Sequence, residues 1–230
     1  MRPIILMYHS IVQENSDDAY AISITNFKEQ MLFLIWEGYK IISLQELVDS
    51  LTRPYKFFFK KYAVLTFDDG YQDFFLNAVP ILQQYKLPAT VFIVTEMLGK
   101  TAEWSQESRN VRLMTEKEIL KIREIGIDVG GHTRRHVDLT ELNERDLKNE
   151  LECSRQKLID WGENFFPFSY PWGRYSKREI LAIKKAGYHC GVTTSNGHIS
   201  FFNNPYLLGR VSIHKNLSIH SFKEIMKNKR

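Results

Sequence analysis

The chain has 230 residues, of which 43% are hydrophobic and 25% charged. This composition excludes a disordered or collagen-like protein and is typical of a globular protein with a substantial core. The formal net charge is +4, and because the basic residues form no concentrated stripe, we expect no nucleic-acid partner.

Short apolar strands alternate with amphipathic helices almost to the end of the chain. Strands are predicted at Ile4–Tyr8, Tyr39–Ile42, Ala63–Phe67, Ala89–Val94, Ile127–Val129, Phe166–Tyr170, His189–Thr193 and Val211–Ile213. Helices are predicted after the cap residues Thr25, Ser43, Thr115, Asn143, Ser176 and Ser218. A further helix over Phe74–Tyr85 should be kinked or divided by Pro80, and Asp73 is expected to cap it. The alternation predicts a parallel sheet with helices outside, and seven or eight such units in one domain (residues 1–230) favour a barrel.

The chain also carries signals about its environment. Cys153 and Cys190 are too few for a disulfide framework, and buried free thiols are favoured over one long-range disulfide. No apolar run has the length of a membrane span, and Met1–Ile11 lacks the apolar centre and cleavage site of a signal peptide. The sequence as given therefore predicts a cytoplasmic protein, or an extracellular one if an upstream segment was omitted.

Acidic, imidazole and aromatic side chains follow several of the predicted strands. These exits carry Asp68-Asp69-Gly70, His132-Thr133-Arg134-Arg135-His136, Pro171-Trp172-Gly173 and His214. In a (β/α) barrel the chemistry lies at the carboxyl ends of the strands, so these side chains should meet at one site.

His132 and His136 are four residues apart, a spacing that brings two imidazoles to one side of a helical turn and suits a metal site. A carboxylate from Asp68 or Asp69 can complete the ligand set, and the other can take a proton from metal-bound water. The alternative is a hydrogen-bonded histidine pair beside an Asp-Asp-Gly turn. The occurrence of both motifs at strand exits favours the metal site.

Three segments resemble the motifs of the polysaccharide deacetylases, also called the NodB-homology or carbohydrate esterase family 4 domain. They are Thr66-Phe67-Asp68-Asp69-Gly70, His132-Thr133-Arg134-Arg135-His136 and Phe168-Ser169-Tyr170-Pro171-Trp172-Gly173. The closest likeness in motif style is to the poly-N-acetylglucosamine deacetylase branch. The resemblance implies a distorted (β/α)7 TIM-like barrel that removes acetyl groups from N-acetylglucosamine-containing saccharides. It further implies that Asp68 is the general base, and that Asp69, His132 and His136 bind one divalent metal, usually Zn²⁺ and sometimes Co²⁺ or Ni²⁺. The backbone N–H of Trp172, next to Pro171, matches the position expected to hold the oxyanion.

Two positions depart from the family pattern. Many members carry an arginine where this chain has Ser169, and we expect Arg210 to orient the base instead. The family's general acid is often a histidine near the last strand. His214 lies in a comparable place, with a surface or capping histidine as the alternative.

Other residues indicate how a substrate could be held. His9 is interpreted either as a pocket residue or as a structural histidine. Trp172 is expected to stack on a sugar ring, whereas Tyr170 is better placed for the core. The stretch Tyr55–Lys61 mixes aromatic and basic residues. We weigh contact with a lipid-linked substrate or a membrane face against a covering loop, which is favoured.

Alternative functions remain compatible with the same residues. An O-acetyl esterase or a small-molecule amidase would use the same metal-activated water. A catalytically silent carbohydrate-binding barrel would explain the loss of arginine at Ser169, but such a module would have no use for Asp68 beside a metal.

Overall fold

The computed structural model describes residues 3–13, 18–51, 61–104, 111–195 and 204–228. Its main sheet contains β10 (Val211–Ser212), β1 (Ile4–Tyr8), β5 (Lys61–Phe67), β6 (Thr90–Ile93), β7 (Asp128–Gly131), β8 (Pro167–Ser169) and β9 (Cys190–Val192), in that order and all parallel. A further strand, β4 (Tyr39–Ile41), pairs with the first residues of β5. The short strands β2 (Ser10–Val12) and β3 (Ala21–Ser23) form a separate pair.

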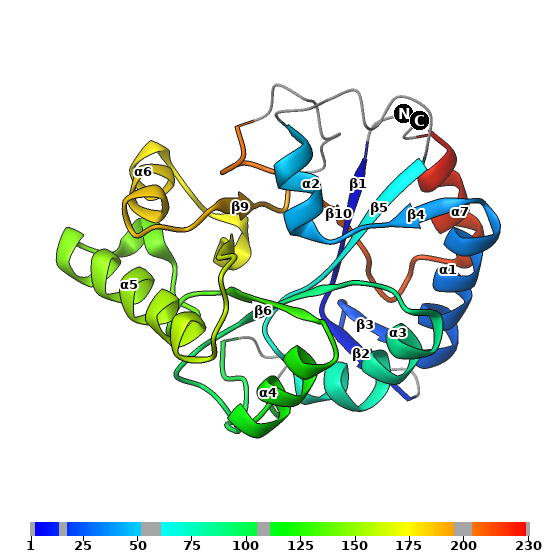
Figure 1. The fold of residues 1–230 in the computed structure, drawn as a ribbon, viewed down its shortest axis with the longest axis horizontal. Coiled ribbons are helices and arrows are strands. Elements are labelled where there is room, and N and C mark those ends of the chain that lie inside the picture. Colours follow the sequence, from blue (N-terminus) through cyan, green and yellow to red (C-terminus); the bar gives the residue numbers. More distant parts are fainter. Residues whose placement is uncertain (1–2, 14–17, 52–60, 105–110, 196–203, 229–230) are drawn as a thin grey trace.

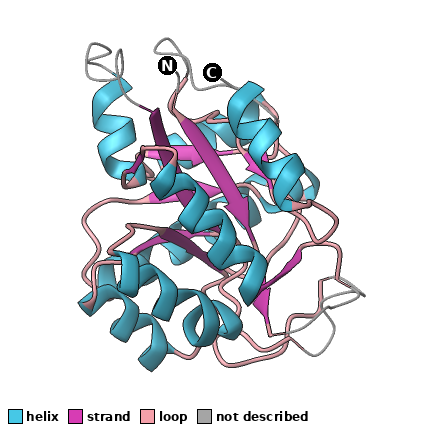
Figure 2. Cartoon of the chain, turned by 90° about the vertical axis from the view of Figure 1, so that its right-hand side faces the viewer, coloured by secondary structure: helices cyan, strands magenta, loops and turns pink. Residues whose placement is uncertain are grey.

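Helices surround the curved sheet, as Figure 1 shows and the rotated view in Figure 2 confirms. They are α1 (Ile24–Trp36), α2 (Leu44–Leu51), α3 (Val79–Tyr85), α4 (Glu116–Glu124), α5 (Glu144–Asp160), α6 (Lys177–Lys185) and α7 (Ile219–Asn228). Short helical turns at Phe74–Ala78, Leu139–Glu141 and Pro171–Gly173 complete the elements. All five residues of β1 are buried. The strand is covered on both faces, which explains why its sequence is apolar throughout and does not alternate with polar residues.

The barrel is not closed by strand pairing between β9 and β10. The residues before β10 fill this gap instead, since Val192 forms a bridge with Leu208 and the amide of Arg210 donates to the carbonyl of Ser195 at 3.0 Å. The predicted distorted barrel of parallel strands with helices outside is therefore confirmed. The irregular connection has a consequence for the site, because it fixes Arg210 directly before the last strand.

Most predicted helix boundaries are confirmed in detail. Thr115 and Ser176 each form a reciprocal capping box, and Asn143 caps the longest helix, as expected from their sequences. Pro80 lies at the start of α3, directly after a π-helical turn, so the predicted helix over Phe74–Tyr85 is divided as expected.

Three local predictions were wrong. Ser23, not Thr25, caps α1, with its hydroxyl accepting from the amide of Asn26 at 3.2 Å. Asp73 makes no side-chain cap bond and instead accepts hydrogen bonds from the Ser10 hydroxyl and the Ile11 amide on β2. Cys153 is exposed because it lies on the outer face of α5, whereas Cys190 is buried; both are free thiols.

Candidate active site

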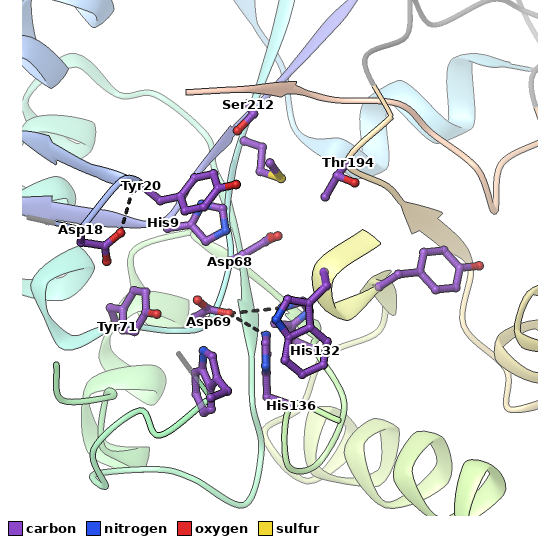
Figure 3. Close-up of a pocket in the computed structure, with 14 residues that line it drawn as sticks. His9, Asp18, Tyr20, Asp68, Asp69, Tyr71, His132, His136, Thr194 and Ser212 are labelled. Atoms are coloured by element: carbon purple, nitrogen blue, oxygen red, sulfur yellow. Dashed lines mark hydrogen bonds and ion pairs between the residues drawn. The ribbon is translucent and has the colours of Figure 1, made fainter. Parts of the chain in front are cut away.

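A pocket opens where the carboxyl ends of the parallel strands meet (Figure 3). Its lining residues are Met7, His9, Asp18, Tyr20, Asp68, Asp69, Tyr71, Trp104, His132, His136, Tyr170, Trp172, Thr194 and Ser212. Residues of β1 and β10, and residues of the segments that follow β1, β5, β7, β8 and β9, therefore reach one cavity, as the barrel argument predicts.

Asp69, His132 and His136 point toward one another across this pocket (Figure 3). Oδ1 of Asp69 lies 3.3 Å from Nε2 of His132 and 3.3 Å from Nε2 of His136. Two ligands bound at about 2.0–2.1 Å to one tetrahedral ion lie about 3.3 Å apart, so these spacings suit a shared ion. One carboxylate and two imidazoles are also the donor set of many catalytic zinc sites. The residues present thus fit the metal that the sequence predicts.

The two adjacent aspartates diverge because the backbone turns sharply between them. Asp69 has φ 71° and Gly70 has φ 73°, both in the left-handed region. At Gly70 a Cβ would lie 2.8 Å from Cδ1 of Ile93, so this position requires glycine for space as well as for conformation. Asp68 consequently faces the barrel interior, while Asp69 faces the two histidines.

Arg210 holds Asp68 through a buried, two-pronged ion pair. Nη1 donates to Oδ1 at 2.7 Å and Nη2 donates to Oδ2 at 2.6 Å. The guanidinium also donates to the hydroxyls of Thr66 and Ser169 and to the carbonyl of Thr193, and the whole side chain is 0% exposed. Burial by itself raises the pKa of Asp68, but the charge and hydrogen bonds of Arg210 outweigh burial and hold it below its usual range. Asp68 is therefore ionised at neutral pH.

The imidazoles respond in opposite directions to the same surroundings. Burial lowers the pKa of both rings, but for His132 the hydrogen bond to Asp69 and the charges of both aspartates outweigh it, so its pKa is raised. For His136 burial dominates and its pKa is lowered. Burial opposes the ionised form of Asp69, yet the hydrogen bonds from both histidines place its pKa well below the ordinary range. Asp69 is thus ionised at neutral pH, as a carboxylate ligand must be.

The turn that carries the histidines is held by a buried glutamate that the sequence analysis missed. Glu150 of α5 is 0% exposed and accepts from the amides of Arg134 and Arg135 at 3.0 and 3.1 Å. It also accepts from Nε of Arg135 at 2.7 Å. Thr133 and His136 have φ values of 62° and 57°, so this turn is strained and needs such anchoring. Helical spacing places Glu150 between Leu147 and Leu151 on the buried face of α5, which is the signal that could have revealed it.

The predicted substrate residues have different locations. Trp172 lines the pocket, is 45% exposed and has φ 53°, and its ring lies 4.4 Å from that of His136. Pro171 is buried. Tyr170 also reaches the pocket wall but is 1% exposed and donates its hydroxyl to the carbonyl of Tyr206, as expected for a residue that mainly builds the core.

The two remaining histidine candidates are separated by the fold. His9 lines the pocket and its ring lies 4.7 Å from that of Tyr20. Its positive form contributes to the electrostatics of both Asp68 and Asp69. His214 is exposed and is not among the residues that line the pocket. The structure therefore brings His9, but not His214, to the other candidate residues.

Asp18, Tyr20, Tyr71 and Trp104 also line the pocket, although the sequence analysis assigned them no role. Three of them are aromatic, and Asp18 is 6% exposed. They come from loops whose course no local pattern predicts. Residues 55–60 of the aromatic-basic stretch Tyr55–Lys61 lie outside the described residues. Its interpretation as a covering loop, or as a contact for a lipid-linked substrate or membrane face, stays a prediction.

Comparison with known proteins agrees with this geometry. Residues 58–191, more than half of the chain, match the polysaccharide deacetylase family. A Bacillus subtilis protein named "Putative polysaccharide deacetylase YxkH" is 32% identical over 220 residues, covering 95% of this chain and 74% of that protein. The chain belongs to the polysaccharide deacetylase family.

Other members of the polysaccharide deacetylase family show how far the likeness extends. The poly-beta-1,6-N-acetyl-D-glucosamine N-deacetylase of Staphylococcus aureus is 26% identical over 215 residues, covering 89% of this chain and 71% of that protein. The structure of the Streptococcus pyogenes deacetylase PplD in complex with acetate superposes with a TM-score of 0.85 at 28% identity, covering 98% of both chains. IcaB from Ammonifex degensii, at 20% identity and a TM-score of 0.77 over 99% of this chain and 97% of its own, shows the fold alone. The family, fold and deacetylase activity predicted from the sequence are confirmed.

No helix within the described ranges has the length and apolar character needed to cross a membrane.

Proposed function

We propose that this polysaccharide deacetylase removes acetyl groups from N-acetylglucosamine-containing saccharides by attack of a metal-activated water. The observation that carries this proposal is the division of labour between neighbouring carboxylates: Asp69 faces His132 and His136, while Asp68 is held by Arg210. The name of the Staphylococcus aureus relative supports the choice of an acetylated amino sugar, and that of the acetate-bound Streptococcus pyogenes deacetylase supports removal of an acetyl group.

Asp69, His132 and His136 would hold the metal, which we take to be Zn²⁺ because imidazole and carboxylate donors in a three-ligand open site suit that ion. When bound, such an ion lowers the pKa of a coordinated water and polarises a carbonyl oxygen. The carbonyl of Ser169, 2.8 Å from Nδ1 of His132, fixes that ring so that Nε2 faces Asp69.

Asp68 is proposed as the general base. Its ionised state lets it accept a proton, and its place beside Asp69 puts it next to the proposed water site. Arg210 is proposed as the residue that orients it, because two parallel N–H···O bonds fix the plane of the carboxylate. Arg210 thus supplies, from the segment before β10, the arginine that the family resemblance places at Ser169.

Proton delivery to the leaving amine is assigned to His9 in preference to His214. Among the described residues that line the pocket, the imidazoles are those of His9, His132 and His136, and the last two are needed as ligands. His9 follows β1, the neighbour of β5 in the sheet. The backbone N–H of Trp172 is the proposed oxyanion donor, since its left-handed conformation turns the chain at the pocket edge.

The function can be tested by measuring acetate release from N-acetylglucosamine oligomers, small acetamido sugars and O-acetylated sugars, with and without added Zn²⁺. We expect Zn²⁺-dependent release from the N-acetylated oligomers. Preference for the O-acetylated sugars or for small amides would replace the substrate assignment by an esterase or amidase. Release from no substrate, despite bound metal, would favour the non-catalytic binding barrel.

A further inference from the structure

The two histidines of the proposed metal site are held in different ways. Nδ1 of His132 lies 2.8 Å from the carbonyl of Ser169. Nδ1 of His136 is also buried, but within the described residues it has no hydrogen-bond partner. Metal-binding histidines almost always donate their second N–H to an acceptor that fixes the ring. The orientation of the His136 ring therefore needs another cause.

Two indole rings flank His136. The Trp104 ring stacks on it with centroids 4.4 Å apart and planes inclined by 23°. The Trp172 ring meets it at the same centroid distance but with planes inclined by 69°. A ring packed against one face and a second at a steep angle leave little freedom about the Cβ–Cγ bond. The two indole contacts thus restrict rotation of the His136 ring, as a hydrogen bond at Nδ1 does in other metal-binding histidines.

Trp104 is fixed to the segment that carries the metal-ligating carboxylate. It lies in the connection between β6 and α4, in which Thr101 forms a bridge with Arg112. Leu113 forms a bridge with Tyr71, which follows Asp69 by two residues. Tyr71, Ala102 and Leu113 form a small apolar cluster against which Trp104 packs. This connection therefore links the exit of β5 to the ring that stacks on His136.

We propose that Trp104 is a positioning residue for His136, acting through its stacked ring in place of the missing hydrogen bond. Binding a cation makes an imidazole electron-poor, and the face of an indole attracts such a ring, so the stack should favour the metal-bound state. This inference rests on the metal site of the proposed function. It predicts that Zn²⁺ affinity depends on an aromatic face at position 104, separately from catalysis.

The experiment compares Trp104→Leu and Trp104→Phe with a matched control, Trp36→Phe, at an indole that is 80% exposed on α1. Zn²⁺ affinity of the metal-free full chain is measured by competition with a chromophoric chelator. Circular dichroism and the melting temperature report whether each variant folds. We expect Trp104→Leu to weaken Zn²⁺ binding by about 10-fold or more, the usual effect of losing a group that orients a ligand. Trp104→Phe should retain most of the affinity, and Trp36→Phe should match the wild type.

Wild-type affinity in folded Trp104→Leu would overturn the role of Trp104 and leave the proposed function intact. A wild-type protein that binds no Zn²⁺ would overturn both. If Trp104→Leu does not fold, Trp104→Met fills similar space without a ring face and takes its place, with the same two outcomes. Quenching of tryptophan emission by Co²⁺ gives an independent reading. The fraction of emission that Co²⁺ quenches should be smaller in Trp104→Phe than in the wild type, but not smaller in Trp36→Phe. A quenched fraction in Trp104→Phe equal to that of the wild type would contradict the stack.

Discussion

Adjacent residues with the same side chain acquire different chemistry at this site. Asp68 and Asp69 share a sequence context, but the left-handed backbone at Asp69 sends their carboxylates to different partners. Asp68 is paired with a guanidinium and Asp69 with two imidazoles. The proposed base and ligand roles therefore rest on the position of the opposite charge and not on the residue type.

Asp68→Asn should abolish most turnover without removing the metal. The amide cannot accept a proton at neutral pH, so we expect kcat to fall by about 10²–10⁴-fold, the usual contribution of a general base. Asp69, His132 and His136 are untouched, so one Zn²⁺ per chain should still bind. Acetate release and metal content measured on the same sample check this. Undiminished turnover would remove Asp68 from the mechanism.

Substitution of Arg210 separates its charge from its geometry. Arg210→Ala leaves a buried carboxylate unpaired and should destabilise the fold by about 3–5 kcal/mol. Arg210→Lys keeps the charge but not the planar fork, so it should fold better yet still lose kcat. The pKa of Asp68 should also rise, which moves the acidic limb of the pH–rate profile upward. Arg145→Ala, at an exposed residue of α5, is the control. Unchanged kcat/KM in Arg210→Ala would refute the orienting role.

At the scale of elements, the site depends on a helix residue that binds the backbone of a neighbouring turn and does not line the pocket. Glu150 reaches from α5 to the turn after β7, so a helix on the outside of the barrel anchors the backbone between the two histidines. The strained φ values in that turn persist because this anchor opposes relaxation. We therefore expect α5 and the proposed metal site to be energetically linked.

Glu150→Gln should weaken both folding and metal binding. The amide offers one oxygen acceptor in place of two, so at least one of the hydrogen bonds to the turn is lost together with the charge. We expect a loss of about 1.5–3 kcal/mol in the free energy of unfolding, typical of a hydrogen bond to a charged group. Zn²⁺ affinity should fall with it. Glu152→Gln, at an exposed position of the same helix, is the control, and equal behaviour of the two variants would contradict the anchoring role.

The carboxyl of Asp128, the first residue of β7, should make the free energy of unfolding depend on pH. Burial, assisted by the negative charge of Glu163, raises its pKa to about 6. A carboxyl whose pKa is raised by folding costs nothing below its unfolded pKa, and its ionisation destabilises the fold as pH rises from about 4 through 6. At pH 7.5 Asp128→Asn should therefore have a higher melting temperature than the wild type, and its free energy of unfolding should be larger by about 1–3 kcal/mol. At pH 4 the gain should be small. Glu29→Gln, at an exposed position of α1, should show no such difference.

At the scale of the whole molecule, the proposed metal site joins segments that follow different strands. Asp69 follows β5 and the two histidines follow β7, with β6 between them in the sheet. A shared ion would therefore cross-link the carboxyl ends of the barrel. Ligand binding to the folded state alone stabilises it by an amount set by concentration and affinity.

Zn²⁺ should raise the melting temperature, and a chelator should lower it. At a free concentration about 100 times the dissociation constant, the expected stabilisation is about 2.7 kcal/mol. Because the ligand imidazoles must be neutral, and the hydrogen bond to Asp69 raises the pKa of His132, metal binding and acetate release should both decline as the solution is made acidic. Equal activity at pH 5 and pH 8, insensitive to chelator, would contradict the metal-dependent mechanism.

The sequence by itself determined the alternation of strands and helices and the metal-binding motif. Apolar runs, cap residues and the position of Pro80 are local signals, and they predicted nearly every element correctly. Asp69, His132 and His136 lie at strand exits, and in a parallel barrel all such exits face the same end. The approximate convergence of these residues therefore follows from fold class.

The tertiary structure alone decided which more distant residues complete the site. The pairing of Arg210 with Asp68 spans 142 residues and arises because the segment before β10 fills the gap left by unpaired β9 and β10. His9 rather than His214 reaches the pocket. Glu150 of α5 binds the turn that carries the histidines, and Trp104, from the connection between β6 and α4, stacks on His136. Such contacts depend on loop paths and helix docking, which arise from packing across the whole barrel and leave no periodic signal in the chain.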